Sequence, residues 1–495
     1  MRALRSVTTR LVANLVVVLA ILPSRALAAG PYGVDDGWAV DHPSGRVLLT
    51  PAKARGYSEA GAGWIRIEFS LLDSPLGHNT WDSDILALYD QAIDNARAGG
   101  LKVVGLIDGG SWRGTQADWL RNSVEEEGGN GDNVYFQNFV RNAVVPLVLH
   151  FQGRIDTWEL WNEPNACTSG CPYRGGTYVH PSNLSWALAR SWVEVHVNQN
   201  ISGVNLYLGG VFGHNIGGVI SYRNAGAQYI DDTYAIGLAG AGSFAWTLSK
   251  YGVLPVDGIM QHFYLDQGGL TTGEHVRQYL DFVRQAYTKY EGADTPKKTI
   301  ITEFGWRTTS VSEEVQAANI ATSFDALNST SYIAGAVLFR YEDVPGLAFG
   351  IVTGGGAHKL SYDDFQLSAT FQGRFAPGSV NADIAAYFDC AGQPALGDPY
   401  DAGNGAWVYA WGRGYAQDFD GGSDGTVIVM VSELGTFEIN DGHGFRSFYL
   451  GNGAIDTYGY PSNNEYEFLS GTRQDFEDGA YLTWDPVDGV VGHRG

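Results

Sequence analysis

Cysteine, methionine and basic residues are scarce in this chain. Its 495 residues include three Cys and three Met, and 31 Lys and Arg stand against 54 Asp and Glu, which gives a net charge of −23. This balance argues against nucleic acid as a partner, because affinity for nucleic acid rests on Lys and Arg. It also disfavours polyanionic ligands, so a neutral or cationic ligand fits the charge better.

The few cysteines offer no convincing metal site. Cys167 and Cys171 are separated by three residues, which without a nearby His is poor spacing for zinc. We therefore predict no metal. In an oxidising compartment these two Cys could pair across a short loop, which would leave Cys390 single.

Long apolar runs are missing after the N-terminus, so we expect no membrane span in the mature chain. The N-terminus has three Arg among its first ten residues, an apolar stretch over 11–22 and the tripeptide Ala26-Leu27-Ala28, a pattern typical of a secretory signal peptide. We expect residues 1–28 to be cleaved and the product to be secreted, either extracellular or associated with the cell envelope; an uncleaved anchor is the alternative. Loss of the four Arg in this segment takes the net charge from −23 to −27.

Short apolar runs alternate with helical patterns between residues 30 and 345. The strand candidates are 64–69, 102–108, 157–163, 206–212, 258–264, 299–304, 334–341 and a weaker run near 32–38. The helix candidates are 81–98, 136–151, 181–197, 273–290 and 312–327. Runs that are apolar on both faces suit buried parallel strands. The alternation predicts an α/β fold, a (β/α)8 TIM barrel over residues 29–370; an open doubly wound sheet is disfavoured, since no Gly-rich phosphate loop follows the first strands.

Beyond residue 370 helical spacing disappears, and a set of landmarks occurs twice in the same order. The first copy contains Gly392, Leu396-Gly397-Asp398-Pro399, Gln417-Asp418-Phe419, Asp424-Gly425 and the β-like run 426–431. The second contains Gly453, Tyr458-Gly459-Tyr460-Pro461, Gln474-Asp475-Phe476, Asp478-Gly479 and the run 480–484. This order predicts an internal repeat in a small β-rich region, residues 371–495.

Two strand candidates of the barrel have a glutamate at or next to their last residue: Glu163 ends the run 157–163 before Pro164, and Glu303 precedes Phe304, the last residue of the run 299–304. A carboxylate inside an apolar run is costly unless it is paired or used, and the carboxyl ends of barrel strands carry catalytic groups. Because the two strands are the first and fourth of four consecutive ones, both side chains can face one central cleft. Two such carboxylates, a proton donor and a nucleophile roughly 5–5.5 Å apart, are what glycoside hydrolysis with retention requires.

The ordered set of Asn162-Glu163-Pro164, then His262 and Tyr264, then Glu303 resembles clan A of the glycoside hydrolases. The motifs are most similar to those of families 39 and 5, and the similarity to family 39 lies in the run WELWNEPN at 158–165. The resemblance covers residues 30 to 345. It implies that Glu163 is the acid/base, that Glu303 is the nucleophile and that Asn162 holds the 2-hydroxyl of the sugar.

The resemblance also implies supporting roles. Tyr264 would position Glu303, and His262 would support Glu163 or the substrate. Arg66 matches the Arg that keeps the nucleophile ionised by opposite charge, although neutralising Glu68, its neighbour on the same strand face, is an equal alternative.

The end of the eighth strand departs from the clan, which often has a Trp there as the floor of the sugar site. Phe339 or Tyr341 would replace it in this chain. We assign Tyr341 and Trp306 to substrate binding, with packing as the alternative for Trp306, and regard Asp108 as a weaker candidate. The charged residues that either add polar contacts or form a local cluster are Arg340, Glu342 and Asp343.

The C-terminal copies resemble LGFP-type repeats, small modules of extracellular and cell-wall-associated proteins, although neither copy spells LGFP. This resemblance implies a contact with cell-wall glycan; a β-rich cap that stabilises the barrel is the alternative.

These features predict a secreted retaining glycoside hydrolase that cleaves a poly- or oligosaccharide by double displacement and needs no cofactor. Two alternatives stay open: a catalytically inactive carbohydrate- or cell-wall-binding protein, and a transglycosylase that uses the same site. The sugar, the linkage and the choice between endo and exo action are not fixed by the sequence.

Overall fold

The computed structural model describes residues 32–41, 43–71, 80–120, 134–166, 176–370, 384, 387, 393–399, 409–423 and 425–494. The predicted signal peptide, all three cysteines, and Gly392 and Asp424 of the first repeat copy lie outside these residues.

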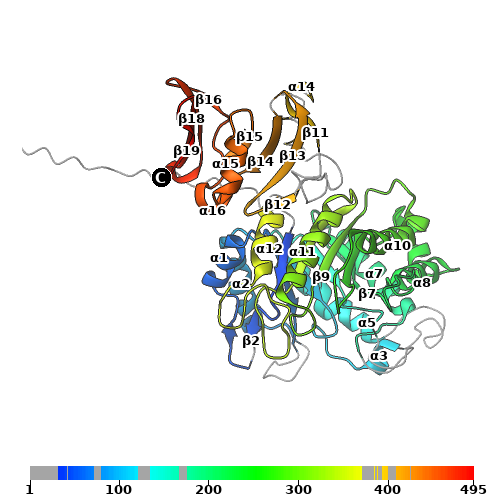
Figure 1. The fold of residues 1–495 in the computed structure, drawn as a ribbon. Coiled ribbons are helices and arrows are strands. Elements are labelled where there is room, and N and C mark those ends of the chain that lie inside the picture. Colours follow the sequence, from blue (N-terminus) through cyan, green and yellow to red (C-terminus); the bar gives the residue numbers. More distant parts are fainter. Residues whose placement is uncertain are drawn as a thin grey trace, which may run out of the picture.

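Eight parallel strands close into a barrel, which confirms the predicted fold class (Figure 1). The strands, in their order around the barrel, are β1 (Tyr32–Asp35), β10 (Ile333–Phe339), β9 (Lys298–Phe304), β8 (Gly258–Tyr264), β7 (Asn205–His214), β6 (Thr157–Leu160), β5 (Lys102–Ile107) and β4 (Trp64–Phe69). The two-stranded hairpin of β2 (Val40–Asp41) and β3 (Arg46–Val47) follows β1.

One predicted strand is too long. We expected it to cover 157–163, but β6 ends at Leu160. Trp161 has a φ of 80° and Glu163 a φ of 46°, and this left-handed conformation does not continue a strand. The catalytic candidate Glu163 therefore lies on a turn above the barrel rather than within a strand.

Helices surround the strands. The predicted helices appear as α2 (Ser83–Ala98), α5 (Val134–Phe139) joined by a π-helical turn to α6 (Val145–His150), α7 (Pro181–Trp192), α10 (Gly273–Glu291) and α11 (Glu313–Asn328). In the barrel region, the helices not predicted are α1 (Pro51–Glu59), α3 (Gln116–Leu120), α8 (Ala227–Leu238), α9 (Ser243–Tyr251) and α12 (Leu360–Thr370). Two of these helices bury only two residues each, which gives a weak periodic signal in the sequence: α1 buries Ala54 and Tyr57, and α9 buries Phe244 and Thr247. Short helices also occur beyond residue 370, where no helical spacing was expected.

Side chains fill the barrel interior in layers. The apolar layer near the amino ends of the strands consists of Val104, Tyr207, Met260 and Ile300, with Trp64 packed against it. Because strand side chains alternate, Arg66 and His262, two residues after Trp64 and Met260, face the next layer. Charged groups thus begin where the apolar filling ends, toward the carboxyl ends of the strands.

The C-terminal region contains two antiparallel sheets and short helices. Its elements are α14 (Gln393–Leu396), β11 (Gly397–Pro399), β12 (Tyr409–Trp411), β13 (Gly414–Gly422), β14 (Gly425–Ser432), β15 (Gly435–Asn440), α15 (Phe445–Gly451), α16 (Ala454–Tyr458), β16 (Tyr466–Phe468), β17 (Gly471–Asp475), β18 (Tyr481–Asp485) and β19 (Gly489–His493).

The two sheets have matching registers. In the first, Tyr409 is opposite Ala416 and Trp411 is opposite Gly414; in the second, Tyr466 is opposite Arg473 and Phe468 is opposite Gly471. The proline of each copy also pairs with the phenylalanine of its Gln-Asp-Phe run, as Pro399–Phe419 and Pro461–Phe476. The proline and the Gln-Asp-Phe run of the two copies therefore occupy equivalent places in the described part of the fold.

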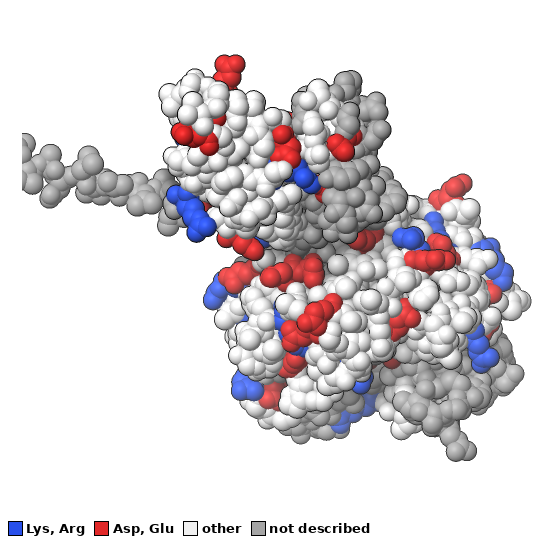
Figure 2. All heavy atoms as spheres, in the orientation of Figure 1, with Lys and Arg blue, Asp and Glu red and all other residues white. Residues whose placement is uncertain are grey.

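The C-terminal region lies beside α11 and α12, at the end of the barrel opposite α3 and β2 (Figure 1). Tyr415 of β13 hydrogen-bonds with Ser368 of α12 across this junction. On the face in Figure 2, Lys and Arg are scattered among acidic and uncharged side chains. None of the described helices is both long and apolar enough to cross a membrane.

Candidate active site

The inward faces of β4 and β8 supply the polar floor of the barrel mouth. His262 and Tyr264 share one face of β8, as their spacing predicted, and Arg66 projects inward from β4. Arg66 and His262 are buried, with exposed fractions of 4% and 0%. A cation and an ionisable ring thus meet below the ends of the strands.

An irregularity in β9 brings Glu303 to the same place. Gln261 pairs with Ile301, but the next residue of β8, His262, pairs with Glu303, so Thr302 is an extra residue. Ile300 already faces the interior, and regular alternation would turn Glu303 outward. The bulge restores its inward direction, and Glu303 consequently lies beside His262.

Glu163 approaches from a turn that is fixed on both sides. Its backbone N–H donates to the Gly210 carbonyl at 2.9 Å, and its carbonyl accepts from the Thr177 hydroxyl at 2.8 Å. Asn165 makes two hydrogen bonds with the backbone of Phe212, each 2.8 Å long. Together these bonds hold the left-handed backbone at Glu163, a conformation that is costly and clusters at functional sites.

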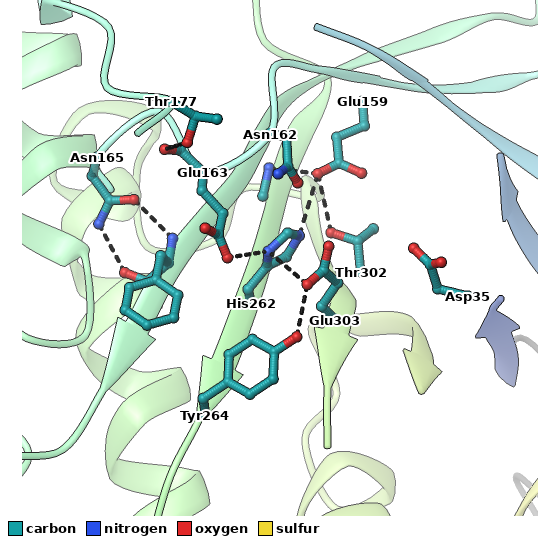
Figure 3. A network of polar contacts seen from close by, with 12 residues as sticks. Asp35, Glu159, Asn162, Glu163, Asn165, Thr177, His262, Tyr264, Thr302 and Glu303 are labelled. Carbon is teal, nitrogen blue, oxygen red and sulfur yellow. Dashed lines mark hydrogen bonds and ion pairs between the residues drawn. The ribbon is translucent and has the colours of Figure 1, made fainter. Parts of the chain in front are cut away.

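The two glutamates converge on His262 (Figure 3). The ring nitrogen Nδ1 lies 3.1 Å from Glu163 Oε1 and 3.5 Å from Glu303 Oε2. One oxygen of each carboxylate and a nitrogen of His262 lie within 4.8 Å of one another. The glutamate side chains remain 23% and 11% exposed, so a substrate can reach both.

Arg66 is the centre of a buried charge cluster. It donates to Glu303 at 2.6 Å, to Asp35 at 2.9 Å and to Asn162 Oδ1 at 2.8 Å. Two further bonds, of 2.7 and 3.1 Å, join it to Glu159. Burial opposes its charge, but Glu159, Glu303 and Asp35 outweigh this effect and hold the pKa of Arg66 well above its usual range.

The same cluster shifts the pKa values of its neighbours. Burial lowers the pKa of His262, but the negative charge of Glu303 and hydrogen bonds to Glu159 and Glu163 outweigh it and raise the pKa to about 9. Burial, then the charge of Glu303, raises the pKa of Tyr264 well above its usual range. Tyr264 therefore stays protonated, and its hydroxyl donates to Glu303 Oε2 at 2.7 Å.

Sequence reasoning missed Glu159, Asp35 and Gly210. Glu159 is fully buried, and the signal for it was the one used for Glu303, a carboxylate inside an apolar run. The Gly209-Gly210 pair inside β7 was the signal for close backbone approach. A side chain at Gly210 would collide with His262 and Glu159, while its N–H donates to Glu159 Oε1 at 2.7 Å.

A second acidic pair lies at the ends of β4 and β5. Burial, then the charge of Asp108, raises the pKa of Glu68 to about 8, and burial raises the pKa of Asp108 to about 6. Trp38, whose side chain is half-exposed, donates its indole N–H to Glu68 at 3.3 Å. Among the described residues, the ion pairs of Arg66 do not include Glu68, so the geometry favours the role of Arg66 beside Glu303.

Two predicted substrate contacts are not brought into this group. Trp306 is fully buried, and its indole donates to the Leu265 carbonyl at 2.7 Å. Tyr341 packs edge-on against Tyr57 of α1, with ring centroids 4.6 Å apart. Both residues follow strand ends, where alternation no longer fixes the side-chain direction, and both pack outside the barrel mouth.

Of the two aromatic candidates at the end of β10, Phe339 is the one that lies at the mouth. Its ring packs edge-on against Tyr264, with centroids 6.5 Å apart, and against Phe349 at 5.3 Å. The charged residues after it form local contacts: Arg340 donates to the Asp36 carbonyl at 2.7 Å, and Asp343 pairs with Lys359 at 2.7 Å.

The grouping of Glu163, His262 and Glu303 has the spacing of a cation site, but its charges do not suit one. His262, with its pKa near 9, carries a proton at neutral pH, and the Arg66 guanidinium already neutralises Glu303 at 2.6 Å. The predicted absence of a metal stays a prediction.

Comparison with solved structures finds similar folds. The chain is similar to a family 39 glycoside hydrolase from the gut symbiont Bacteroides cellulosilyticus WH2 (14% identity, 82% of this chain and 71% of that one, TM-score 0.48). It is also similar to a glucosidase from Croceicoccus marinus (14%, 81% and 74%, 0.45) and to an endo-1,4-beta-xylanase from Penicillium canescens (14%, 70% and 97%, 0.45). No family model and no curated protein matches the sequence, so the chemistry has to be judged from the side chains themselves.

Proposed function

We propose that this chain is a glycoside hydrolase that cleaves O-glycosidic bonds with retention of configuration. The observation that carries the proposal is the close approach of Glu163 and Glu303, whose nearest oxygens lie within 4.8 Å of each other and both face Nδ1 of His262. Retaining enzymes hold their carboxyl groups roughly 5–5.5 Å apart, and inverting enzymes about 6.5–9.5 Å apart to admit a water molecule. The short separation therefore supports double displacement.

In the first step a Glu303 oxygen attacks the anomeric carbon and forms an ester bond to it, while the bond to the leaving oxygen breaks and that oxygen takes the proton of Glu163. In the second step Glu163 takes a proton from water, the water oxygen bonds to the anomeric carbon, and Glu303 leaves as a carboxylate. The substrate is a poly- or oligosaccharide, and no cofactor takes part in either step.

The neighbours of Glu303 suit a nucleophile. Tyr264 and Arg66 each donate to a different oxygen of its carboxylate, which stabilises the negative charge and fixes its direction. Arg66 also occupies the amide oxygen of Asn162, so the amide nitrogen is the group that can donate to a sugar hydroxyl.

The test is to assay Glu303→Gln and Glu163→Gln on a panel of activated aryl glycosides that differ in the sugar. We expect turnover by each variant to fall by about 10³-fold or more on the sugar the wild type accepts. Azide, a small anionic nucleophile, should partly restore turnover. Glu433→Gln, a change of the same type on an exposed residue of the C-terminal region, is the matched control and should keep wild-type activity. Wild-type turnover by either active-site variant would end the assignment.

The two alternatives make different predictions in the same experiment. A binding protein with an inactive barrel would bind glycan and hydrolyse no member of the panel. A transglycosylase would lose activity in both variants but would transfer the sugar to an added acceptor faster than to water.

We also propose that the enzyme is secreted and that its C-terminal region contacts cell-wall glycan. Support comes from the signal-peptide pattern of residues 1–28 and from the duplicated β-sheet unit, whose order of landmarks resembles LGFP-type repeats. Co-sedimentation of the full chain with insoluble wall glycan tests this role. Retention by the Glu163→Gln variant, whose barrel is inactive, is expected, and recovery of all protein in the supernatant would favour a purely structural cap.

A further inference from the structure

Glu159 is the most deeply buried carboxylate of the barrel mouth, and double displacement gives it no direct task. It lies in β6 between Trp158 and Leu160 with no exposed surface. Burial of an unpaired carboxylate costs several kcal/mol, so its partners define its role.

Those partners surround both carboxylate oxygens. Arg66 makes two hydrogen bonds to it, of 2.7 and 3.1 Å. The Gly210 N–H donates to Oε1 at 2.7 Å and the Thr302 hydroxyl at 3.3 Å. His262 Nε2 lies 3.5 Å from the same oxygen. Burial raises the pKa of Glu159, but Arg66 and His262 outweigh it and lower the pKa to about 2, so Glu159 is charged in any solution above that pH.

The ring of His262 is thus held between carboxylates on both sides. Nε2 faces Glu159, and Nδ1 faces Glu163 at 3.1 Å and Glu303 at 3.5 Å. Both ring nitrogens can donate only when the imidazole is protonated. The geometry therefore suits an imidazolium rather than either neutral tautomer.

We propose that Glu159 is a positioning residue that keeps His262 a cation, with its Nδ1–H directed between Glu163 and Glu303. This inference rests on the function proposed above and deepens it. Glu159 does not touch the reacting atoms, and it acts through His262 and Arg66.

The reaction explains why a fixed cation between the two glutamates is useful. Before the first step Glu303 is the carboxylate and Glu163 holds the proton. In the glycosyl-enzyme Glu303 is a neutral ester and Glu163 is the carboxylate. The negative charge therefore moves from one side of Nδ1–H to the other, and an imidazolium anchored from behind by Glu159 can donate to whichever glutamate carries it, without reorganisation of the site.

Every charged group that faces His262 affects whether its ring is protonated. Glu159 of β6, Glu163 of the following turn and Glu303 of β9 favour the cation, whereas Arg66 of β4, with Nη2 3.5 Å from Nε2, opposes it. Tyr279 of α10 faces the backbone and donates to the His262 carbonyl at 2.7 Å. Because Glu159 is always charged and lies beside Nε2, removing its charge is expected to lower the pKa of His262.

The experiment is an NMR titration of the His262 ring in the full-length wild type and in Glu159→Gln, which preserves the shape and removes the charge. The pH profiles of kcat and KM are measured alongside, with Glu159→Asp as the variant that keeps the charge. In the wild type we expect His262 to titrate near pH 9. In Glu159→Gln the titration of His262 should move down by about one pH unit or more, with little change in KM, and Glu159→Asp should lie between the two.

A wild-type His262 that titrates near its ordinary value of 6.5 overturns the inference without any variant, so it does not depend on the folding of Glu159→Gln. An unchanged titration in a folded Glu159→Gln also overturns it and leaves Glu159 a structural role only. Because the titration needs no turnover, a failure of the proposed hydrolase activity would be recognised separately, by the panel of glycosides.

Discussion

Ion pairs are arranged differently in the barrel and in the C-terminal region. At the barrel mouth Arg66 contacts three carboxylates that come from three other strands, which are Asp35, Glu159 and Glu303. In the C-terminal region Arg446 of α15 pairs with Asp418 of β13 at 2.6 Å. The equivalent acid of the second repeat copy, Asp475, accepts from Arg473, two residues before it, at 2.6 Å.

The difference separates two uses of ion pairs. Asp418 and Asp475 recur at one position of the repeat, so their ion pairs belong to its packing. At the barrel mouth, acids from several elements share Arg66 or His262. Two of them, Glu163 and Glu303, stay partly open to solvent. A cluster of several titratable groups at one solvent-accessible position is typical of a catalytic site. Four substitutions test whether the two regions differ in this way, beginning with the one expected to reduce turnover most.

Arg66→Met should have the largest effect. It would leave three carboxylates without their shared counter-charge, which should lower the free energy of unfolding by about 3–5 kcal/mol. It should also reduce kcat/KM by about 10³-fold. Denaturant unfolding and an aryl glycoside assay measure the two effects. A folded variant with near wild-type turnover would show that the cluster is structural, like the pairs of the C-terminal region.

Tyr264→Phe should have an intermediate effect. The hydroxyl donates to a charged oxygen of Glu303, and hydrogen bonds to charged groups contribute roughly 1.5–3 kcal/mol. We expect kcat/KM to fall about 10- to 100-fold with little loss of stability. Tyr449→Phe, which removes a hydroxyl bonded to the Gly459 carbonyl in the C-terminal region, is the control. Equal effects of the two changes on turnover would contradict the account.

Trp306→Phe should change turnover little. The indole is enclosed and bonded to Leu265, so the change should cost about 1–3 kcal/mol of stability. Initial rates over a range of substrate concentrations should give kcat/KM within about threefold of wild type, a change of less than 1 kcal/mol. A large rise in KM with unchanged stability would restore Trp306 to the role that we first assigned it.

Arg446→Met should leave turnover unchanged. Removing one partner of the nearly buried pair with Asp418 should lower the stability of the C-terminal region by up to about 3 kcal/mol. Thermal unfolding followed together with activity measures both effects. Loss of turnover in the folded variant would mean that the C-terminal region takes part in the catalytic site.

The sequence was most informative where periodicity and strand order decide the structure. Apolar runs on both faces predicted the parallel strands, and the spacing of His262 and Tyr264 predicted their shared direction. The order of the strands predicted that Glu163 and Glu303 lie at the same end of the barrel, but their close approach also needs the turn at Glu163 and the bulge at Thr302. The other inferences need only regular geometry and the closure of the barrel.

The rest depended on departures from regular geometry. The bulge at Thr302 sets the direction of Glu303, and the positive φ of Trp161 ends β6 early; neither has a clear residue signature. Trp306 and Tyr341 were placed in the site because they follow strands, but side-chain direction beyond a strand end is set by tertiary packing. The partners of Glu159 could have been predicted from the free-energy cost of burying a charged side chain, since a lone carboxylate in a buried strand needs partners.

Covalent trapping identifies the nucleophile itself. The wild type is incubated with an activated 2-deoxy-2-fluoro derivative of the sugar that it accepts, and the labelled peptide is identified by mass spectrometry. We expect one glycosyl group per chain, attached to the Glu303 side chain. Label on another residue, or product of inverted anomeric configuration without any adduct, would contradict this expectation.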